Sequence, residues 1–325
     1  METGDDAGGK GKAWVGKRVL LSPGSGWDRR VEGPEGKGFG IRGGVVGVKG
    51  QGGDGNGGVD VRGTAVTEML VEVGDVEEAP HHLGAVENAA LPLVGVTAWR
   101  ALVTKIGKGN LGEDRRVLIT GIGGGVALMA AAFAVKMGTE VWVTSGEVGK
   151  IQRAVEMLGV AGGVCYKDKG WEKEVLGKMR ELNRKRDAGG EEGELWFDAI
   201  LDGAGGDIVE KGAKILKTGG VISMYGMTLG PKVPFTMQAV LKNIELRGST
   251  MGSRAEFRDM LAFVREKQIR PVISRTVHVP GLTGDQSLDA IDSLFEDMKE
   301  NKQFGKLVVE IARENDEDET EKSKL

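Results

Sequence analysis

Short apolar runs and amphipathic stretches alternate along the middle of the chain. The apolar runs, each expected to form a strand, occupy residues 117–120, 140–144, 163–166, 199–202, 221–225 and 244–249. Stretches with helical spacing of apolar residues occupy residues 126–137, 148–158, 171–184, 208–216, 236–242 and 255–267. This alternation is typical of a parallel sheet with right-handed crossover helices. We therefore predict an α/β fold built on a doubly wound parallel sheet.

The N-terminal part of the chain lacks this regular alternation. Residues 15–21 and 41–48 look like strands, and residues 65–73 are also strand-like. Residues 86–104 are apolar enough to form a buried connection and a helix. We expect this part of the chain to be weakly structured up to about Gly58.

The C-terminal part also departs from the alternation. After Pro271 the pattern predicts a strand at 275–279, an amphipathic helix at 287–299 and a strand at 306–311. We expect these elements to return to the N-terminal domain. Residues 313–325 contain six acids, three bases and almost nothing apolar, which predicts a disordered tail.

Composition narrows the class of protein. The 325 residues are 40% hydrophobic and 28% charged. The net charge of -4 gives no reason to expect binding to nucleic acid. The longest apolar stretch, residues 126–135, is far shorter than the roughly 18 residues that span a bilayer, and no signal peptide is apparent. We expect a soluble intracellular protein. Of 55 glycines, 20 lie in residues 1–60, where residues 50–58 are expected to form a flexible loop.

Cysteine and histidine are scarce. Cys165 is the only cysteine, so an intrachain disulfide and a four-cysteine zinc site are both excluded. A catalytic zinc site would need three ligands, and the only histidines are His81, His82 and His278. We therefore predict no metal site.

The strongest chemical signal is a glycine cluster between a strand and a helix. Residues 117–138 read VLITGIGGGVALMAAAFAVKMG, an apolar strand followed by glycines and an almost wholly apolar helix. Glycines let the backbone approach a pyrophosphate, whose charge is met by free N–H groups at the helix N-terminus. The strict spacing of the G-x-G-x-x-G fingerprint is only partly met, and the alternative is a tight turn without a ligand. The predicted cofactor-binding residues here are Gly121, Gly123, Gly124, Gly125 and Val126.

The end of the second strand indicates which dinucleotide is bound. A site for NAD usually has an acid about 20 residues after the glycines, where it accepts hydrogen bonds from the ribose. Ser145 occupies this place, and Lys150 follows on the next helix. A hydroxyl and a cation suit a 2′-phosphate, so we predict NADPH. The alternative for Lys150 is a solvated helix lysine.

These residues and further motifs resemble one family. The motifs are LPLVGVTAWRAL at 91–102, the 121–127 loop, TSG at 144–146 with Lys150, DAILDGAGG at 198–206, LKTGG at 216–220, YG at 225–226 and FGK at 304–306. Together they resemble the quinone-oxidoreductase branch of the medium-chain dehydrogenase/reductase superfamily. The resemblance covers residues 13–311. It implies a GroES-like catalytic domain beside a Rossmann domain, NADPH as hydride donor and usually a homodimer.

The resemblance also implies a domain division and further cofactor contacts. The division is a partial GroES-like domain with a glycine-rich loop at 1–90, an NADPH-binding Rossmann domain at 91–270, a return to the catalytic domain at 271–312 and a tail at 313–325. Tyr166 is placed with Ser145 and Lys150 around the adenosine phosphate. The remaining implied cofactor contacts are Gly203, Ala204, Tyr225, Gly226, Met251 and Gly252.

The sequence departs from the family in two ways. Ala90 stands about where zinc-dependent members have a cysteine ligand, so the resemblance is to zinc-free enzymes that transfer hydride to a quinone or an α,β-unsaturated carbonyl. Few residues precede 15–21, where family members carry further strands of the catalytic domain. We therefore expect an NADPH-dependent reductase with an N-terminally shortened GroES-like domain, and the alternative is an NADPH-binding protein with impaired or no catalysis. No general acid stands out, and we name no catalytic residue.

The last three residues are Ser323, Lys324 and Leu325. S-K-L at a free carboxyl terminus is the peroxisomal address. The sequence therefore predicts recognition by the peroxisomal import receptor and a location in the peroxisomal matrix, with the cytoplasm as the alternative.

Overall fold

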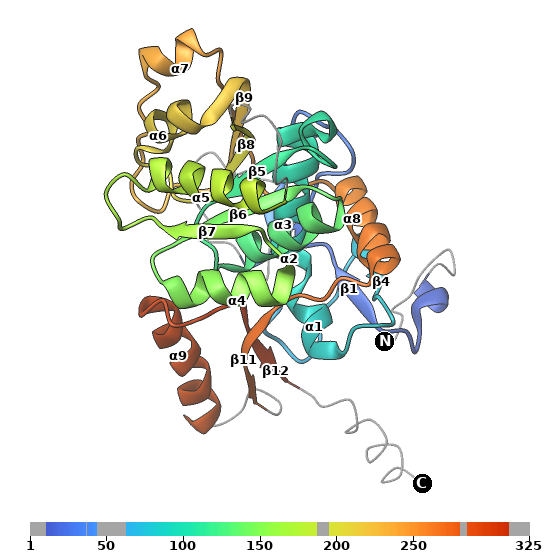
Figure 1. The fold of residues 1–325 in the computed structure, drawn as a ribbon. Helices are drawn as coiled ribbons and strands as arrows, with labels where there is room; N and C mark the ends of the chain where they lie inside the picture. The colour runs from blue at the N-terminus through green and yellow to red at the C-terminus, as the bar shows by residue number, and fades with distance from the viewer. Residues whose placement is uncertain (1–10, 37, 44–62, 187–194, 280–284, 312–325) are drawn as a thin grey trace, which may run out of the picture. The chain divides into compact units, whose positions relative to one another are not determined.

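The computed structural model describes residues 11–36, 38–43, 63–186, 195–279 and 285–311 (Figure 1). The chain divides into two compact units. One comprises residues 97–250, and the other comprises residues 1–96 and 251–325. The tripeptide Ser323, Lys324 and Leu325 and most of the glycine-rich segment lie outside the described residues.

The unit of residues 97–250 is built on a six-stranded parallel sheet. Its strands are β5 (Arg116–Ile119), β6 (Glu140–Ser145), β7 (Gly162–Cys165), β8 (Phe197–Asp202), β9 (Leu216–Met224) and β10 (Glu245–Gly248). The spatial order is β10-β9-β8-β5-β6-β7, so the chain reverses its direction of travel across the sheet between β5 and β8. The predicted doubly wound α/β fold is confirmed. In such a sheet, ligands bind at the carboxyl ends of the strands around this reversal.

Helices connect the strands of this unit. They are α3 (Gly125–Lys136), α4 (Val148–Leu158), α5 (Trp171–Arg186), α6 (Ile208–Ile215) and α7 (Met237–Leu241). The helix α3 is almost wholly apolar because it is covered: residues 127–134 are all buried. On the side of the sheet covered by α5 and α6, the core is formed by Leu118, Trp142, Val164, Val175, Met179, Phe197 and Val209, among others. The π-helix η3 (Arg100–Gly107) and the 3-10 helix η4 (Lys108–Asn110) precede β5.

In the described residues of the other unit, the strands form three two-stranded sheets. The pairs are β1 (Val19–Leu21) with β4 (Val76–Glu78), β2 (Gly24–Ser25) with β3 (Gly40–Ile41), and β11 (Ile273–His278) with β12 (Lys306–Glu310). Its helices are η1 (Gly11–Trp14), η2 (Val73–Asp75), α1 (Ala85–Ala90), α8 (Arg254–Lys267) and α9 (Asp285–Lys299). The helix α2 (Pro92–Trp99) spans the boundary between the units.

A buried carboxylate ties this unit together. Asp75 is 1% exposed and accepts hydrogen bonds from Arg42 Nη2 at 2.5 Å and Ser25 Oγ at 3.0 Å. Arg254, at the start of α8, pairs with the other carboxylate oxygen at 3.2 Å. Removing one partner of a buried ion pair is costly because a charge is then left uncompensated. The contacts of Asp75 therefore hold together segments that are far apart in the sequence.

The strand prediction for residues 65–73 is wrong. In the structure residues 63–72 form no helix or strand, and the strand of this region is β4 (Val76–Glu78). Leu70 is 96% exposed, so the apolar residues that suggested the strand have no sheet to pack against. Within 15–21 only Val19–Leu21 is a strand, because Gly16 turns the chain with a φ of +71°.

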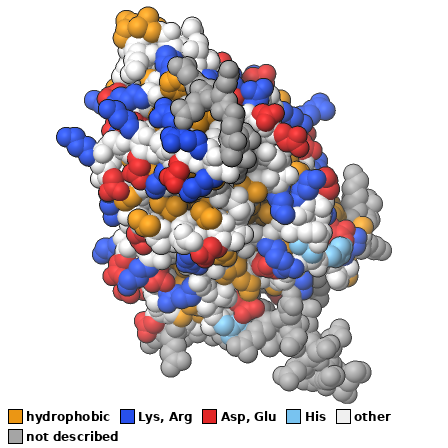
Figure 2. Space-filling model, viewed as in Figure 1, with side chains coloured by type: hydrophobic (Ala, Val, Ile, Leu, Met, Phe, Trp, Pro, Cys, Tyr) orange, Lys and Arg blue, Asp and Glu red, His pale blue; other side chains and the backbone are white. Residues whose placement is uncertain are grey.

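Charged side chains of both signs lie on the surface of the described residues. On the face shown in Figure 2, lysine and arginine side chains are interspersed with aspartate and glutamate. None of the helices in the described part of the chain is both long and apolar enough to cross a membrane.

Candidate functional site

The glycine loop joins β5 to α3 in a conformation that only glycine adopts easily. Gly121 has a φ of +67° and Gly123 a φ of +123°. Gly124 is the N-cap of α3 and offers no side chain to the first N–H groups of the helix. These N–H groups, which begin with those of Gly125 and Val126, are therefore open to an anion, and the helix dipole favours a negative charge there. The loop fits a pyrophosphate.

The end of β6 holds this loop in place. The Ile122 N–H donates to Thr144 O at 2.7 Å, and the Gly121 N–H donates to Thr144 Oγ1 at 3.3 Å. Ser145 is 3% exposed, and its hydroxyl donates to Ile122 O and accepts from the Glu147 N–H, both at 3.3 Å. Ser145 therefore fixes the glycine loop against the β6–α4 turn. Its predicted contact with a 2′-phosphate stays a prediction.

The other two residues predicted at the adenosine phosphate also lie around this turn. Lys150 Nζ forms an ion pair with Glu147 Oε1 at 3.0 Å, and its side chain is 13% exposed. Tyr166 donates its N–H to Ser145 O at 3.0 Å and is 48% exposed. A Cβ atom built on Gly146 would lie 2.7 Å from Tyr166 Oη, so the tyrosine hydroxyl lies against this glycine.

Asp202, a residue without a predicted role, lies at the reversal point of the sheet. Its carboxylate accepts hydrogen bonds from Thr120 Oγ1 at 2.5 Å, from the Gly205 N–H at 2.7 Å and from the Ala204 N–H at 3.2 Å. Burial raises the pKa of Asp202 above its usual value, and these hydrogen bonds oppose the shift. Asp202 therefore links the ends of β5 and β8. The sequence signal that could have identified Asp202 is an aspartate at the end of an apolar strand.

Tyr225, Gly203 and Gly226 form a close-packed group at the ends of β8 and β9. A Cβ atom on Gly203 would lie 2.6 Å from Tyr225 Cζ, and one on Gly226 would lie 2.8 Å from Gly203 O. The Tyr225 N–H donates to Asp202 O at 2.9 Å. Burial and the charge of Asp202 both raise the pKa of the Tyr225 hydroxyl, which therefore stays neutral. Only glycine fits beneath this ring.

Met251 and Gly252 belong to the other unit. Met251 has a φ of +44° and is buried against Trp27 and Phe39. A Cβ atom on Gly252 would lie 2.6 Å from Val96 Cγ2. Both residues are tightly packed, and their proximity to the nicotinamide stays a prediction.

The described residues do not fit a zinc site. No three histidine, cysteine, aspartate or glutamate side chains in this part of the chain are grouped closely enough to hold a metal ion. The histidines are engaged separately: His81 with Glu78, His82 with the carbonyl of Ile269 and His278 with Glu310.

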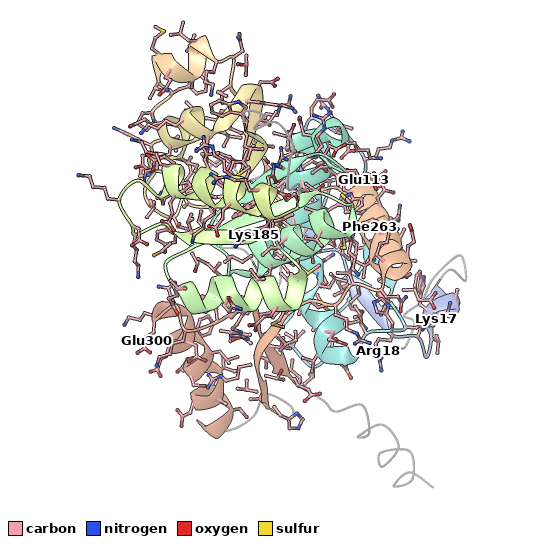
Figure 3. All side chains as sticks on the ribbon, in the orientation of Figure 1. Lys17, Arg18, Glu113, Lys185, Phe263 and Glu300 are labelled. Atoms are coloured by element: carbon pink, nitrogen blue, oxygen red, sulfur yellow. The ribbon has the colours of Figure 1, made fainter. Side chains whose placement is uncertain are left out.

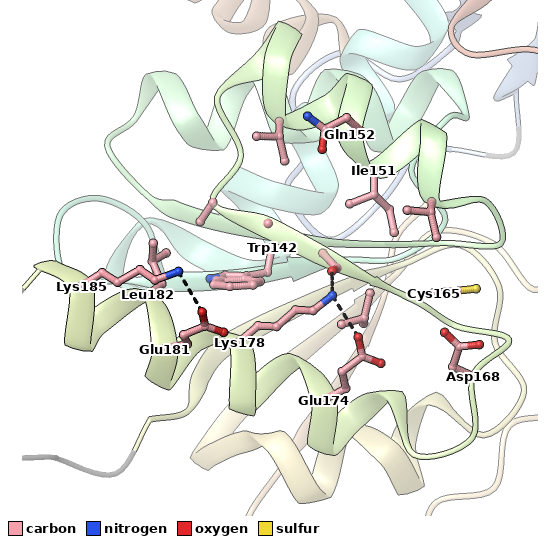
Figure 4. A pocket seen from close by; sticks show the side chains of 16 residues that line it. Trp142, Ile151, Gln152, Cys165, Asp168, Glu174, Lys178, Glu181, Leu182 and Lys185 are labelled. Atoms are coloured by element: carbon pink, nitrogen blue, oxygen red, sulfur yellow. Dashed lines mark hydrogen bonds and ion pairs between the residues drawn. The ribbon is translucent and has the colours of Figure 1, made fainter.

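A groove of about 410 Å³ runs beside the edge strand β7, between α4 and α5 (Figure 4). Trp142, Ile151 and Leu182 line its apolar part. Two lysines of α5 that line the groove are paired within the helix, Lys178 with Glu174 at 2.9 Å and Lys185 with Glu181 at 2.8 Å (Figure 4). Lys185 is also labelled among the side chains drawn in Figure 3. The groove contains none of the residues of the glycine loop, so it is separate from the candidate cofactor site.

Comparison with known proteins connects this geometry to a family. The family described as zinc-binding dehydrogenase matches residues 125–266. A zinc-type alcohol dehydrogenase-like protein YogA from Leptosphaeria maculans is 46% identical over 300 residues, which cover 91% of this chain and 75% of that protein. An acryloyl-coenzyme A reductase from Metallosphaera sedula is 28% identical, over 62% of this chain and 52% of the reductase.

A solved structure described as an NAD-dependent alcohol dehydrogenase has a TM-score of 0.70 and 25% identity. The similarity covers 91% of this chain and 76% of that one. The strand order, the glycine loop and the 46% identical relative lead to the same assignment. The chain belongs to the zinc-type alcohol dehydrogenase-like proteins of the medium-chain dehydrogenase/reductase superfamily of pyridine-nucleotide-dependent oxidoreductases.

Proposed function

We propose that this protein is an NADPH-dependent reductase that transfers hydride to a quinone or an α,β-unsaturated carbonyl. The observation that carries the proposal is the glycine loop, whose uncapped helix N-terminus lies beside the reversal point of the sheet. The described residues offer no zinc ligand set, and metal-free hydride transfer to a conjugated acceptor needs none. The relative that is an acryloyl-coenzyme A reductase by name supports a conjugated carbonyl as the acceptor.

In this proposal the residues of the site bind the cofactor and orient it. The N–H groups at the start of α3 hold the pyrophosphate, and Asp202 keeps the ends of β5 and β8 together beside it. When bound, NADPH would supply a hydride, two electrons and one proton, to the conjugated acceptor, at the β-carbon where the acceptor is an α,β-unsaturated carbonyl. Solvent would supply the proton that completes the reduction. The neutral Tyr225 hydroxyl adds no charge near this end of the sheet.

The first experiment is a panel of acceptors. We expect the protein to oxidise NADPH with 2-cyclohexenone, an enoyl thioester or benzoquinone at least tenfold faster than with the corresponding saturated ketone or thioester. A chelator should leave the rate unchanged, since the proposed transfer needs no metal. The measurement is the loss of NADPH absorbance, compared with heat-inactivated protein.

Two other outcomes would contradict the proposal. Quenching or enhancement of NADPH fluorescence without any oxidation across the panel would indicate a nucleotide-binding protein without this activity. Oxidation of an alcohol with NADP⁺ that is lost on chelation and restored by zinc would indicate a zinc alcohol dehydrogenase instead.

The proposal includes a homodimer formed through the edge strand β10. Leu246 is 38% exposed, and Met237 and Leu241 on α7 are 70% and 75% exposed. Figure 2 shows hydrophobic side chains gathered at the top of the view, over α7. In a two-fold antiparallel pair centred on Leu246, Glu245 of one copy lies opposite Arg247 of the other, so the strand is complementary in charge to itself.

Replacing Leu246 with glutamate tests this arrangement. Two like charges would then lie opposite each other at the two-fold axis, so we expect the variant to sediment as a monomer and the wild type as a dimer. The matched control is Met157→Glu, at a 54% exposed position on α4, which should remain a dimer. A monomeric wild type, or a Leu246→Glu variant that still sediments as a dimer, would contradict the proposed interface.

A further inference from the structure

The β7–α5 loop lies against the turn that follows β6. A Cβ atom built on Gly146 would meet Tyr166 Oη at 2.7 Å and Lys167 Cε at 3.0 Å. The side chain of Lys167 therefore lies beside the segment that contains Ser145 and Gly146, although it comes 21 residues later in the sequence. Gly146 has no side chain to separate the lysine from this turn.

The two lysines beside the turn differ in whether an acidic side chain pairs with them. Lys150 is paired with Glu147 at 3.0 Å, so its charge is largely compensated. Lys167 is exposed and has no ion pair or side-chain hydrogen bond within the part of the chain that the structure describes. The acid that follows it, Asp168, lines the groove beside β7. Lys167 therefore places beside the turn a positive charge that no ion pair compensates in the described part of the chain.

The position of this charge matches one part of the proposed cofactor. In a doubly wound sheet, the ribose of the adenosine lies beyond the end of the strand after the glycine loop, which here is β6. A 2′-phosphate on that ribose is a dianion that would be repelled by Glu147 unless a nearby cation outweighs it. Lysine donates charge-assisted hydrogen bonds to phosphate, and a tyrosine hydroxyl can donate another.

We infer that Lys167, together with the hydroxyl of Tyr166, forms the 2′-phosphate site and selects NADP over NAD. The inference rests on the proposed function, since it assigns the specificity of the same cofactor site. Lys150 acts in it mainly by neutralising Glu147. The lysine predicted from spacing therefore has a positioning role, and the lysine on the crossing loop is the specificity residue.

Binding measurements on three lysine variants test this inference. We expect Lys167→Ala to weaken NADPH about tenfold and to change NADH less than twofold, as measured by cofactor fluorescence. The same variant should weaken 2′,5′-ADP about tenfold and 5′-AMP less than twofold, as measured by calorimetry. Lys169→Ala is the matched control on the same loop, and Lys150→Ala should weaken NADPH less than Lys167→Ala does.

The outcomes separate the inference from the proposed function. A wild type that binds NADPH and NADH equally well would contradict the NADPH assignment itself, and with it the role of Lys167. A wild type that prefers NADPH, combined with a Lys167→Ala variant that keeps this preference, would overturn the inference alone. Equal weakening of NADPH and NADH would also overturn it, and unchanged thermal unfolding of the variant would exclude a folding defect as the cause.

Discussion

Replacing Gly124 with aspartate should leave the protein as stable as before and weaken both NADPH and NADH at least 100-fold. Gly124 has the extended conformation of an N-cap, with φ -75° and ψ 148°, and a Cβ atom there would meet only Gly121 O at 3.9 Å. Aspartate is a better N-cap than glycine by a few tenths of a kcal/mol, so the fold should tolerate it. Its carboxylate would occupy the N–H groups meant for the pyrophosphate and repel it, which corresponds to a loss of about 2.7 kcal/mol in binding.

Asparagine at the same position separates charge from shape. Gly124→Asn caps the helix as aspartate does but carries no charge, so we expect a loss of affinity of about tenfold. Gly84→Asp is the second control, since Gly84 is also an exposed N-cap glycine but lies at α1. Calorimetry gives the affinities and thermal unfolding the stabilities. If Gly124→Asp bound either dinucleotide as tightly as the wild type, the glycine loop would not be the cofactor site.

The parallel sheet could be predicted because each of its strands carries its own signal. β5, β6 and β7 are buried runs bounded by glycine turns, and their observed bounds differ from the predicted ones by at most one residue at each end. The part of the chain before residue 97 gives no such signal. The strands described there are two or three residues long, and they are held by contacts such as Arg42 with Asp75, which lie 33 residues apart in the sequence. Pattern within a short window cannot reveal such contacts.

The part of the candidate site that acts through backbone groups could be predicted from the sequence. The glycines from 121 to 125 indicate a phosphate loop because the absence of side chains is visible in the sequence itself. The role of Asp202 depends on pairing with Thr120, 82 residues earlier, once β5 and β8 are neighbours. The place of Lys167 depends on a loop that lies against Gly146. Both follow from strand order, which no local pattern encodes.

The same substitution at two glycines of the unit of residues 97–250 should change its stability in opposite directions. A Cβ atom on Gly163 in β7 would lie 2.5 Å from Val143 O and 2.8 Å from Ile151 Cγ2. Gly163→Ala would therefore push β7 away from β6 and α4, and overpacking of this kind costs about 3 kcal/mol. Gly177 is exposed in the middle of α5, where a Cβ atom would meet nothing within 4 Å. Gly177→Ala should stabilise the fold by about 0.7 kcal/mol, because alanine loses less backbone entropy in a helix.

Thermal unfolding of the two variants measures both effects. For a unit of this size, we expect the midpoint to fall by about 8 °C for Gly163→Ala and to rise by about 2 °C for Gly177→Ala. Gly177 lies far along α5 from the end of β7, so its variant should also keep the nucleotide affinity of the wild type. A Gly163→Ala variant with an unchanged midpoint would mean that β7 is not packed against Val143 and Ile151. The glycines of this chain therefore divide by surroundings: some leave room for a neighbour, some shape the phosphate loop, and Gly177 is replaceable.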